Sequence, residues 1–287
     1  IDPIDPNVVY VGTEANGVFK TTDSGKSWSR LRIGFKCTIA QSFFPQIFDL
    51  AIDPSNPRIL YAATVNGPGP SSPVAYPSAS AGVYKSTDGG ATWEQKNSGL
   101  ASTYVTTVLV DATRSNRVYA VVGGLNATCP TQANTITNGG VYVSDDGAET
   151  WSPLTLPAGV ETNIFIGANL RGSDQRTLSL SGQVHNTDAP TAYGFVRSSD
   201  GGVSWTVSNP TGEKVSEFDV FTPDPNIVYA NVTSGRRVQR SGDGGATWRA
   251  IGPSIFFGIA RIHPRNSQVL YYTSGGGGIS KTIDGFE

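Results

Sequence analysis

The stretch that decides the fold is Ser86-Thr-Asp-Gly-Gly-Ala-Thr-Trp93, a short box that the chain repeats. Six segments follow its form, Ser/Thr-x-Asp-x-Gly-x-Ser/Thr-Trp, although the third carries Ala148 in the glycine slot and the sixth stops before its tryptophan. The boxes contain six aspartates spaced 41 to 65 residues apart, Asp23, Asp88, Asp146, Asp200, Asp243 and Asp284, and all five tryptophans, Trp28, Trp93, Trp151, Trp205 and Trp248. Self-similarity at this spacing indicates a repeat architecture.

A second element precedes the boxes. Its clearest copy reads Asp53-Pro-Ser-Asn-Pro-Arg-Ile-Leu-Tyr61, and it is flanked by short apolar, β-branched runs. Runs of this length, bounded by Asp-Pro or Gly turns, are typical of strands. In the second unit the pattern predicts strands at 47–52, 58–64 and 82–86, with a fourth strand that starts at Trp93.

Four short strands per repeat predict a propeller blade, and several blades must pack around an axis to bury both faces of each sheet. We therefore predict an all-β fold: a β-propeller of four-stranded antiparallel blades, with six repeats visible, in a six- or seven-bladed ring. A single propeller domain is expected over 1–287, with incomplete end blades because the chain is processed or part of a longer one. The expected blades cover about 1–30, 45–98, 104–155, 160–208, 216–251 and 256–287.

The box residues have a structural explanation. An aspartate can accept hydrogen bonds from the backbone N–H groups that follow it, and so hold a tight turn. The glycines permit positive φ, and the tryptophan can wedge between blades as a large apolar anchor. We expect the box aspartates and tryptophans to be scaffold residues without a catalytic role.

The repeated box resembles the Asp-box, or bacterial neuraminidase repeat, of a β-propeller superfamily. That superfamily includes sialidases, xyloglucan-cleaving glycoside hydrolases, sortilin-type receptors and photosystem II assembly factors. The resemblance covers essentially the whole chain. Within the superfamily, the sequence is most similar to the assembly-factor and sialidase-like secreted propellers. It implies a fold and says little about function, because one fold hosts many functions.

Composition narrows the function classes. The 287 residues carry 21 basic and 23 acidic side chains, a net charge of −2, whereas a nucleic-acid partner would require a basic stripe. No run approaches the roughly 20 consecutive apolar residues of a membrane span. Two cysteines and two scattered histidines have no metal-ligand spacing, so we predict no metal and no other cofactor. The composition is typical of secreted proteins, and we expect an extracytoplasmic location.

Several repeats carry long insertions, and these are predicted to lie on one face of the propeller. Loops on one face of a rigid scaffold commonly bind ligands. The candidate ligand-binding residues are Phe43, Phe44 and Tyr76. Surface decoration without a ligand is the alternative.

The sequence also predicts a disulfide and two possible glycosylation sites. Cys37 and Cys129 are expected to form a disulfide that joins two insertions, with two free thiols as the alternative. Asn126 and Asn231 begin sequons that would accept an N-linked glycan in a suitable host.

A catalytic reading depends on Asp49 and Asp219, which follow phenylalanine at the start of the first strand in the second and fifth blades. Glycosidases need two carboxyl groups about 5–10 Å apart, so a facing pair would suit them. The alternative is that both aspartates are turn residues at strand starts. The sequence contains neither the arginine set of a sialidase nor a Ser-His-Asp arrangement.

Three functions remain open from the sequence. The leading hypothesis is a non-catalytic, extracytoplasmic propeller that binds a protein or a glycan through its loop-rich face. The second is a glycoside hydrolase of the sialidase or xyloglucanase type. The third is a structural repeat segment of a larger cell-surface protein or assembly.

Overall fold

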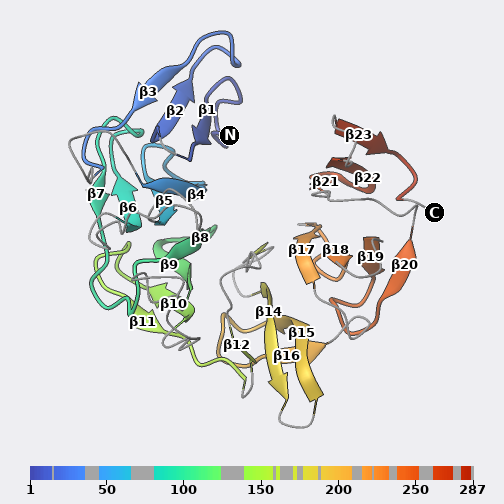
Figure 1. Cartoon of the computed structure of the whole chain (residues 1–287). Helices are drawn as coiled ribbons and strands as arrows, with labels where there is room; N and C mark the ends of the chain where they lie inside the picture. The colour runs from blue at the N-terminus through green and yellow to red at the C-terminus, as the bar shows by residue number, and fades with distance from the viewer. Residues whose placement is uncertain are drawn as a thin grey trace, which may run out of the picture. The chain divides into compact units, whose positions relative to one another are not determined.

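The computed structural model describes residues 1–14, 16–35, 45–65, 81–123, 139–157, 160–161, 171–172, 177–186, 189–208, 215–221, 223–232, 238–251, 261–273 and 279–285. These residues form strands and turns, with no helix among them. The chain divides into two compact units, 1–154 and 155–287. Figure 1 shows that each unit is a succession of small sheets.

Unit 1 contains three antiparallel sheets, in the orders β1-β2-β3, β4-β5-β6-β7 and β8-β9-β10-β11. Neighbours in each sheet are consecutive in the chain, so every sheet is a simple meander. Its strands are β1 (Val9–Gly12), β2 (Val18–Thr21), β3 (Ser29–Leu31), β4 (Gln46–Ile52), β5 (Leu60–Val65), β6 (Gly82–Ser86), β7 (Glu94–Gln95), β8 (Val105–Asp111), β9 (Arg114–Val122), β10 (Gly140–Ser144) and β11 (Ser152–Pro153).

Unit 2 also contains three antiparallel sheets. The first has five strands because β13 pairs with β14 beside the path β12-β14-β15-β16, and the others run β17-β18-β19-β20 and β21-β22-β23. Its strands are β12 (Val160–Glu161), β13 (Arg171–Gly172), β14 (Leu178–Asn186), β15 (Ala189–Ser198), β16 (Thr206–Ser208), β17 (Val215–Val220), β18 (Val228–Val232), β19 (Val238–Ser241), β20 (Arg249–Ile251), β21 (Arg261–His263), β22 (Asn266–Thr273) and β23 (Ile279–Thr282).

The prediction of an all-β fold with four-stranded antiparallel sheets is confirmed. In the second repeat, the predicted strands at 47–52, 58–64 and 82–86 correspond to β4, β5 and β6, and β7 follows Trp93. The first and last sheets have three strands each within the described part of the chain.

The core of unit 1 lies between its sheets. All six residues of β5 are buried, and they alternate in direction as strand residues do. Leu60 and Ala62 pack toward the first sheet, whereas Tyr61 and Ala63 pack toward the third. A sheet covered on both faces explains why this strand reads as a continuous apolar run.

Glycines at positive φ let the chain pass from one sheet to the next. Gly34 has φ 96° and lies on the backbone of Trp93, whose N–H donates to the Ile33 carbonyl at 2.9 Å. A Cβ on Gly34 would stand 1.8 Å from the Trp93 carbonyl oxygen, so no other residue fits. Gly99 makes the same crossing over Trp151.

The core of unit 2 follows the same plan. Phe195 of the first sheet makes edge-on contacts with Phe218 and Trp248 of the second, at ring-centroid distances of 5.1 and 5.3 Å. Tyr229 and Leu270 are buried between the second and third sheets. Each unit is therefore stabilised by apolar layers between consecutive sheets.

Candidate functional site

Each box turn is closed by its aspartate. The Asp88 carboxylate accepts the backbone N–H of Thr92 at 2.9 Å, the Thr92 hydroxyl at 2.6 Å and the Ser86 hydroxyl at 2.8 Å. The Thr92 hydroxyl is the main reason why the pKa of Asp88 falls from 3.8 to about 2. This carboxylate is charged at neutral pH and is occupied by its own turn.

The same bonding recurs in the other boxes. A hydroxyl four residues after the aspartate is the main cause that lowers the pKa of Asp23, Asp146 and Asp243 to about 2, and that of Asp200 still further. In the sixth box, Asp284 accepts the hydroxyl of Thr282. This is the geometry that the predicted scaffold role requires.

The box tryptophans take two environments. Trp93 and Trp151 lie under a crossing connection and are each 4% exposed, and the Trp151 indole donates to the Lys96 carbonyl of the preceding sheet at 2.9 Å. Trp28 is 43% exposed, and its indole donates to Gly25 of its own box at 3.1 Å. A box tryptophan therefore becomes an anchor between sheets where a preceding connection covers it.

A tyrosine and a lysine join each of the first two sheets to the box of the following sheet. In the first sheet, Tyr10 and Lys20 are register partners, and the Lys20 ammonium lies 5.1 Å from the centre of the Tyr10 ring. The Tyr10 hydroxyl and the Lys20 ammonium both donate to the Gly89 carbonyl in the second box, at 3.1 and 3.2 Å. We call this arrangement the tyrosine–cation clamp.

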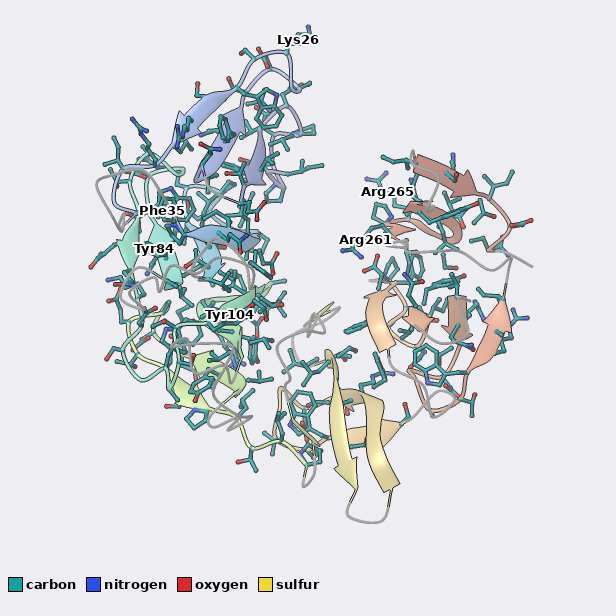
Figure 2. The ribbon with its side chains drawn as sticks, in the orientation of Figure 1. Lys26, Phe35, Tyr84, Tyr104, Arg261 and Arg265 are labelled. Atoms are coloured by element: carbon teal, nitrogen blue, oxygen red, sulfur yellow. The ribbon has the colours of Figure 1, made fainter. Side chains whose placement is uncertain are left out.

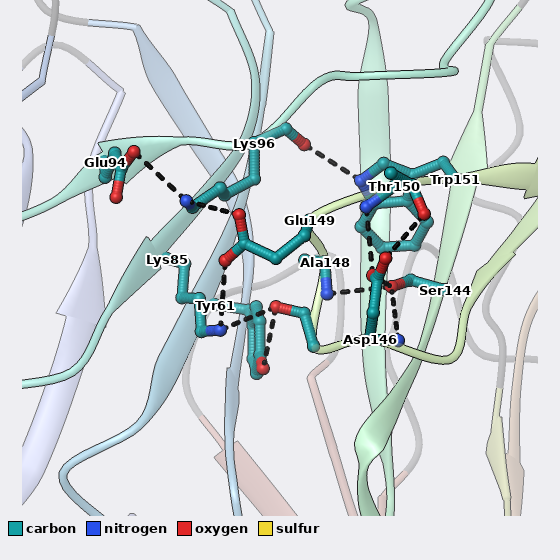
Figure 3. A network of polar contacts seen from close by, with 11 residues as sticks. Tyr61, Lys85, Glu94, Lys96, Ser144, Asp146, Ala148, Glu149, Thr150 and Trp151 are labelled. Atoms are coloured by element: carbon teal, nitrogen blue, oxygen red, sulfur yellow. Dashed lines mark hydrogen bonds and ion pairs between the residues drawn. The ribbon is translucent and has the colours of Figure 1, made fainter.

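The second sheet repeats the clamp on the third box (Figure 3). Lys85 donates to the Gly147 carbonyl at 2.7 Å, and Tyr61 donates to the same oxygen at 3.5 Å. Glu149 adds ion pairs to Lys85 at 3.7 Å and to Lys96 at 2.7 Å. Burial is the main reason why the pKa of Tyr61 is raised, so this phenol stays a hydrogen-bond donor.

The third sheet obtains its cation from a different strand. Val143 occupies the position opposite Tyr119 where the first two sheets have lysine. Arg117 replaces that lysine: its Nε donates to the Tyr119 hydroxyl at 2.8 Å, and its guanidinium lies 5.4 Å from the ring centre. The pairing of tyrosine with a cation is therefore kept although the cation comes from another position, and Arg117 also donates to Asp145 in the box of its own sheet at 2.9 Å.

The two aspartates proposed as a catalytic pair also bridge neighbouring sheets. Asp49 on β4 accepts the N–H of Leu50 at 2.9 Å and that of Val108 on β8 at 3.2 Å. Asp219 on β17 accepts the N–H of Ile262 on β21 at 2.9 Å. Each carboxylate thus ties the first strand of its sheet to the first strand of the following sheet.

The two aspartates occupy different positions along their strands. Asp49 pairs with Ala63, two residues after Tyr61, whereas Asp219 pairs with Tyr229, which matches Tyr61 at the end of its own Asp-Pro element. Asp219 therefore lies two positions further along its strand than Asp49 does. The two lie in different units, and a catalytic pair stays a prediction.

The first strands share a bulge directly before the Asp49 position. The register shifts at Phe48 in β4, Thr106 in β8 and Ser216 in β17, so the same site in three sheets has an extra residue. Bulges re-aim side chains and are common beside active sites. Of the three bulge residues, Phe48 alone is aromatic, and it is 51% exposed.

An aromatic pair and a polar pair each include a residue from the start of β4. The centre of the Phe48 ring lies 6.3 Å from the centre of the Tyr104 ring. Tyr104 directly precedes β8 and is labelled in Figure 2. Gln46, also on β4, donates to the Glu14 carboxylate at 2.8 Å. We call Glu14, Gln46, Phe48, Asp49 and Tyr104 the β4-end cluster, and it is the candidate site of unit 1.

Most of this cluster was not predicted. Phe48 and Tyr104 read as ordinary strand residues, and only the exposed bulge distinguishes Phe48. Glu14 lies in a short turn whose sequence carries no catalytic motif. The signal that could have found them is the absence of Glu14 and Phe48 counterparts from the other repeats.

Comparison with known proteins gives relatives of one kind by sequence. No protein-family profile matches the chain. It is 25% identical to the xyloglucanase Xgh74A of Acetivibrio thermocellus over 289 residues, covering 87% of this chain and 31% of that enzyme. It is also 25% identical to a xyloglucanase of a Paenibacillus species over 243 residues, covering 80% of this chain and 18% of that enzyme. The chain spans less than a third of the length of these relatives.

Solved structures give two kinds of neighbour. The GH74 xyloglucanase of Xanthomonas campestris superposes with a TM-score of 0.69 at 17% identity, covering 100% of this chain and 45% of that one. YCF48 bound to D1 peptide superposes with a TM-score of 0.62 at 14% identity, covering 98% and 77%. Both neighbours are propellers. The chain has the β-propeller fold.

Several predicted site residues of the propeller lie outside the described residues. They are Cys37, Phe43, Phe44, Tyr76, Asn126 and Cys129. Asn231 lies within the central strand β18 and is partly buried.

Two searches of the described residues bear on metals and membranes. They contain no group of three or more His, Cys, Asp or Glu side chains that could hold a metal ion. Nor do they contain a helix long and apolar enough to cross a membrane.

Proposed function

We propose that this chain is a propeller of a xyloglucan-degrading glycoside hydrolase and that it binds xyloglucan. The observation that carries the proposal is the sequence similarity to bacterial xyloglucanases, which extends over 80% or more of this chain. The chain covers less than a third of those enzymes. We therefore assign to it one propeller of such an enzyme and part of the site that binds the polysaccharide.

The same proposal includes two finer assignments. We assign the chain to the Asp-box propeller superfamily, and the support is five box turns in which the aspartate accepts the hydroxyl four residues later. A polysaccharide substrate outside the cell requires an extracytoplasmic protein. A non-catalytic function has less support, since the relatives by sequence are enzymes.

The β4-end cluster is the part of unit 1 that we assign to the polysaccharide. Glycosidases place two carboxyl groups around the bond they cleave. Asp49 supplies one carboxylate, and Glu14 supplies a second that is linked to the same strand through Gln46.

The test uses the purified chain and xyloglucan. Binding is measured by affinity electrophoresis, and cleavage by the release of reducing ends. We expect the chain to bind xyloglucan, and expect any cleavage to be lost in Asp49→Asn and Glu14→Gln. Asp145→Asn is the matched control, because Asp145 is an exposed carboxylate in a surface ion pair with Arg117.

The two readouts separate the hypotheses. Binding without cleavage supports a glycan-binding propeller that needs a further domain for hydrolysis. A folded chain that neither binds nor cleaves xyloglucan contradicts the proposal.

A peptide-binding propeller is the second candidate. The observation that favours it is the superposition on YCF48 bound to D1 peptide, which has a TM-score of 0.62 and covers 98% of this chain. A propeller of this kind would bind a peptide through its loop-rich face. Selective binding on a peptide array, together with no affinity for xyloglucan, would support this candidate over the first.

A further inference from the structure

We propose that Phe48 and Tyr104 form a stacking platform for a pyranose ring of a β-linked glucan. The inference rests on the proposed function, and it names the residues and the chemistry by which unit 1 would hold the polysaccharide. It is carried by the bulge, the exposure of Phe48, and the polar side chains of the β4-end cluster.

The bulge shows that the fold does not need an aromatic ring at this position. Thr106 and Ser216 occupy the same bulge in two other sheets, and both are small and polar. Phe48 buries too little to contribute much to the core, because half of its surface is exposed. We assign the exposed ring to a ligand because a bulge re-aims the side chain it carries and because bulges are common beside active sites.

Tyr104 supplies the second ring and a fixed support. Its carbonyl accepts the N–H of Gly123 at 2.8 Å, and its N–H donates to the Ser102 hydroxyl at 3.2 Å. The two rings are inclined at 59°, so together they form an angled apolar surface. A pyranose ring presents C–H groups on its face, and these groups pack on aromatic faces as other apolar groups do.

The polar neighbours match the edge of a sugar. Hydroxyls project from the rim of a pyranose ring, and Gln46 and Glu14 place an amide and a carboxylate beside the same strand end. Sites that bind small polar ligands combine an apolar surface with a few oriented polar groups in this way. A Glu14 carboxylate at this strand end favours a neutral polysaccharide over an anionic one, because like charges repel.

The experiment measures the dissociation constant for xyloglucan by affinity electrophoresis. We expect Phe48→Ala and Phe48→Leu to raise it about tenfold each, whereas Phe48→Trp stays within about twofold, because the aromatic face matters and not the volume alone. Tyr104→Ala should raise it by a similar factor. Tyr271→Ala is the control, since Tyr271 is an exposed aromatic residue outside the cluster.

The outcomes separate this inference from the function it rests on. A wild-type chain without affinity for xyloglucan contradicts the proposed function and the platform together. Wild-type affinity in both Phe48→Ala and Phe48→Leu, with binding otherwise intact, overturns the platform and leaves the function standing. The thermal unfolding midpoints of Phe48→Leu and Phe48→Trp are measured as well. Equal midpoints show that a difference in their affinity does not come from a difference in folding.

Discussion

At the scale of single residues, positive φ decides which box positions can vary. The slot two residues after the box aspartate is glycine in four boxes, at Gly25, Gly90, Gly202 and Gly245, whereas it is Ala148 in the third and Phe286 in the sixth. Ala148 has φ 74° and is completely buried, so this slot accepts a Cβ where the neighbours leave room. The left-handed conformation still costs a non-glycine residue about 1–2 kcal/mol.

Gly245→Ala should be far more harmful than Gly25→Ala. A Cβ on Gly245 would meet the Phe195 ring at 2.4 Å, so crowding adds to the backbone strain, for a total of about 2–5 kcal/mol. A Cβ on Gly25 meets only the Trp28 ring, at 3.7 Å, and should lose about 1–2 kcal/mol. Urea unfolding of both variants measures the difference. Equal losses would show that crowding by Phe195 is unimportant.

At the scale of strands and sheets, the clamp explains why Arg117 differs from the other repeats. Removing its guanidinium in Arg117→Ala should lower the free energy of unfolding by about 1–2 kcal/mol. Val143→Lys should restore the loss in that background, because residue 143 faces Tyr119 as Lys20 faces Tyr10. The measurement is a double-mutant cycle in urea. If Val143→Lys has the same effect with and without Arg117, the two positions do not substitute for each other.

The Asp49 bridge predicts a second change at this scale. Asp49→Ala leaves the Val108 N–H without its acceptor and should lower stability by about 1–3 kcal/mol. Asp49→Asn keeps an acceptor oxygen and should lose less. Hydrogen exchange of the Val108 amide checks the mechanism, since its protection should fall in Asp49→Ala first. Unchanged protection would show that the bridge does not hold β8.

Strand positions could be predicted from the sequence, but register could not. The dipeptides Phe48-Asp49 and Phe218-Asp219 look equivalent, yet Asp49 lies 12 residues before Tyr61 and Asp219 lies 10 before Tyr229. The apolar pattern shows that a strand is present, but it does not show which residue of the next strand lies opposite each position. The structure pairs Ile52 with Leu60 and Val220 with Val228, so the two turns have equal length and the difference in spacing becomes an offset of two positions.

At the scale of the whole molecule, the fold could be predicted from the sequence more fully than the candidate site. The boxes and Asp-Pro turns could be found because they recur in sequence, and recurrence reflects contacts that every sheet makes with its neighbour. Phe48 and Glu14 have no counterpart in the other repeats, so a search for recurring residues passes over them. A repeat protein therefore shows its scaffold in what its units share, and its candidate site in what one unit has alone.

The dependence of stability on pH also belongs to the whole molecule, because several boxes titrate together. The pKa values of Asp23, Asp88, Asp146 and Asp243 are about 2 in the folded chain, below the usual 3.8 that unfolding restores. Between these values the unfolded chain binds more protons, so acid favours unfolding. We expect the box contribution to be fully present above about pH 5 and to be lost progressively as the pH falls from about 4 toward 2.

Thermal unfolding across this range distinguishes hydrogen bonds from ion pairs as the cause. The depressed pKa values come from hydroxyl and N–H donors, so added salt should leave the acid-induced fall nearly unchanged. Asp88→Asn removes one titrating group and should make the fall shallower, whereas Glu94→Gln, at an exposed ion pair with Lys96, should not. A midpoint that stays constant down to about pH 2 would contradict the assignment of acid sensitivity to the boxes.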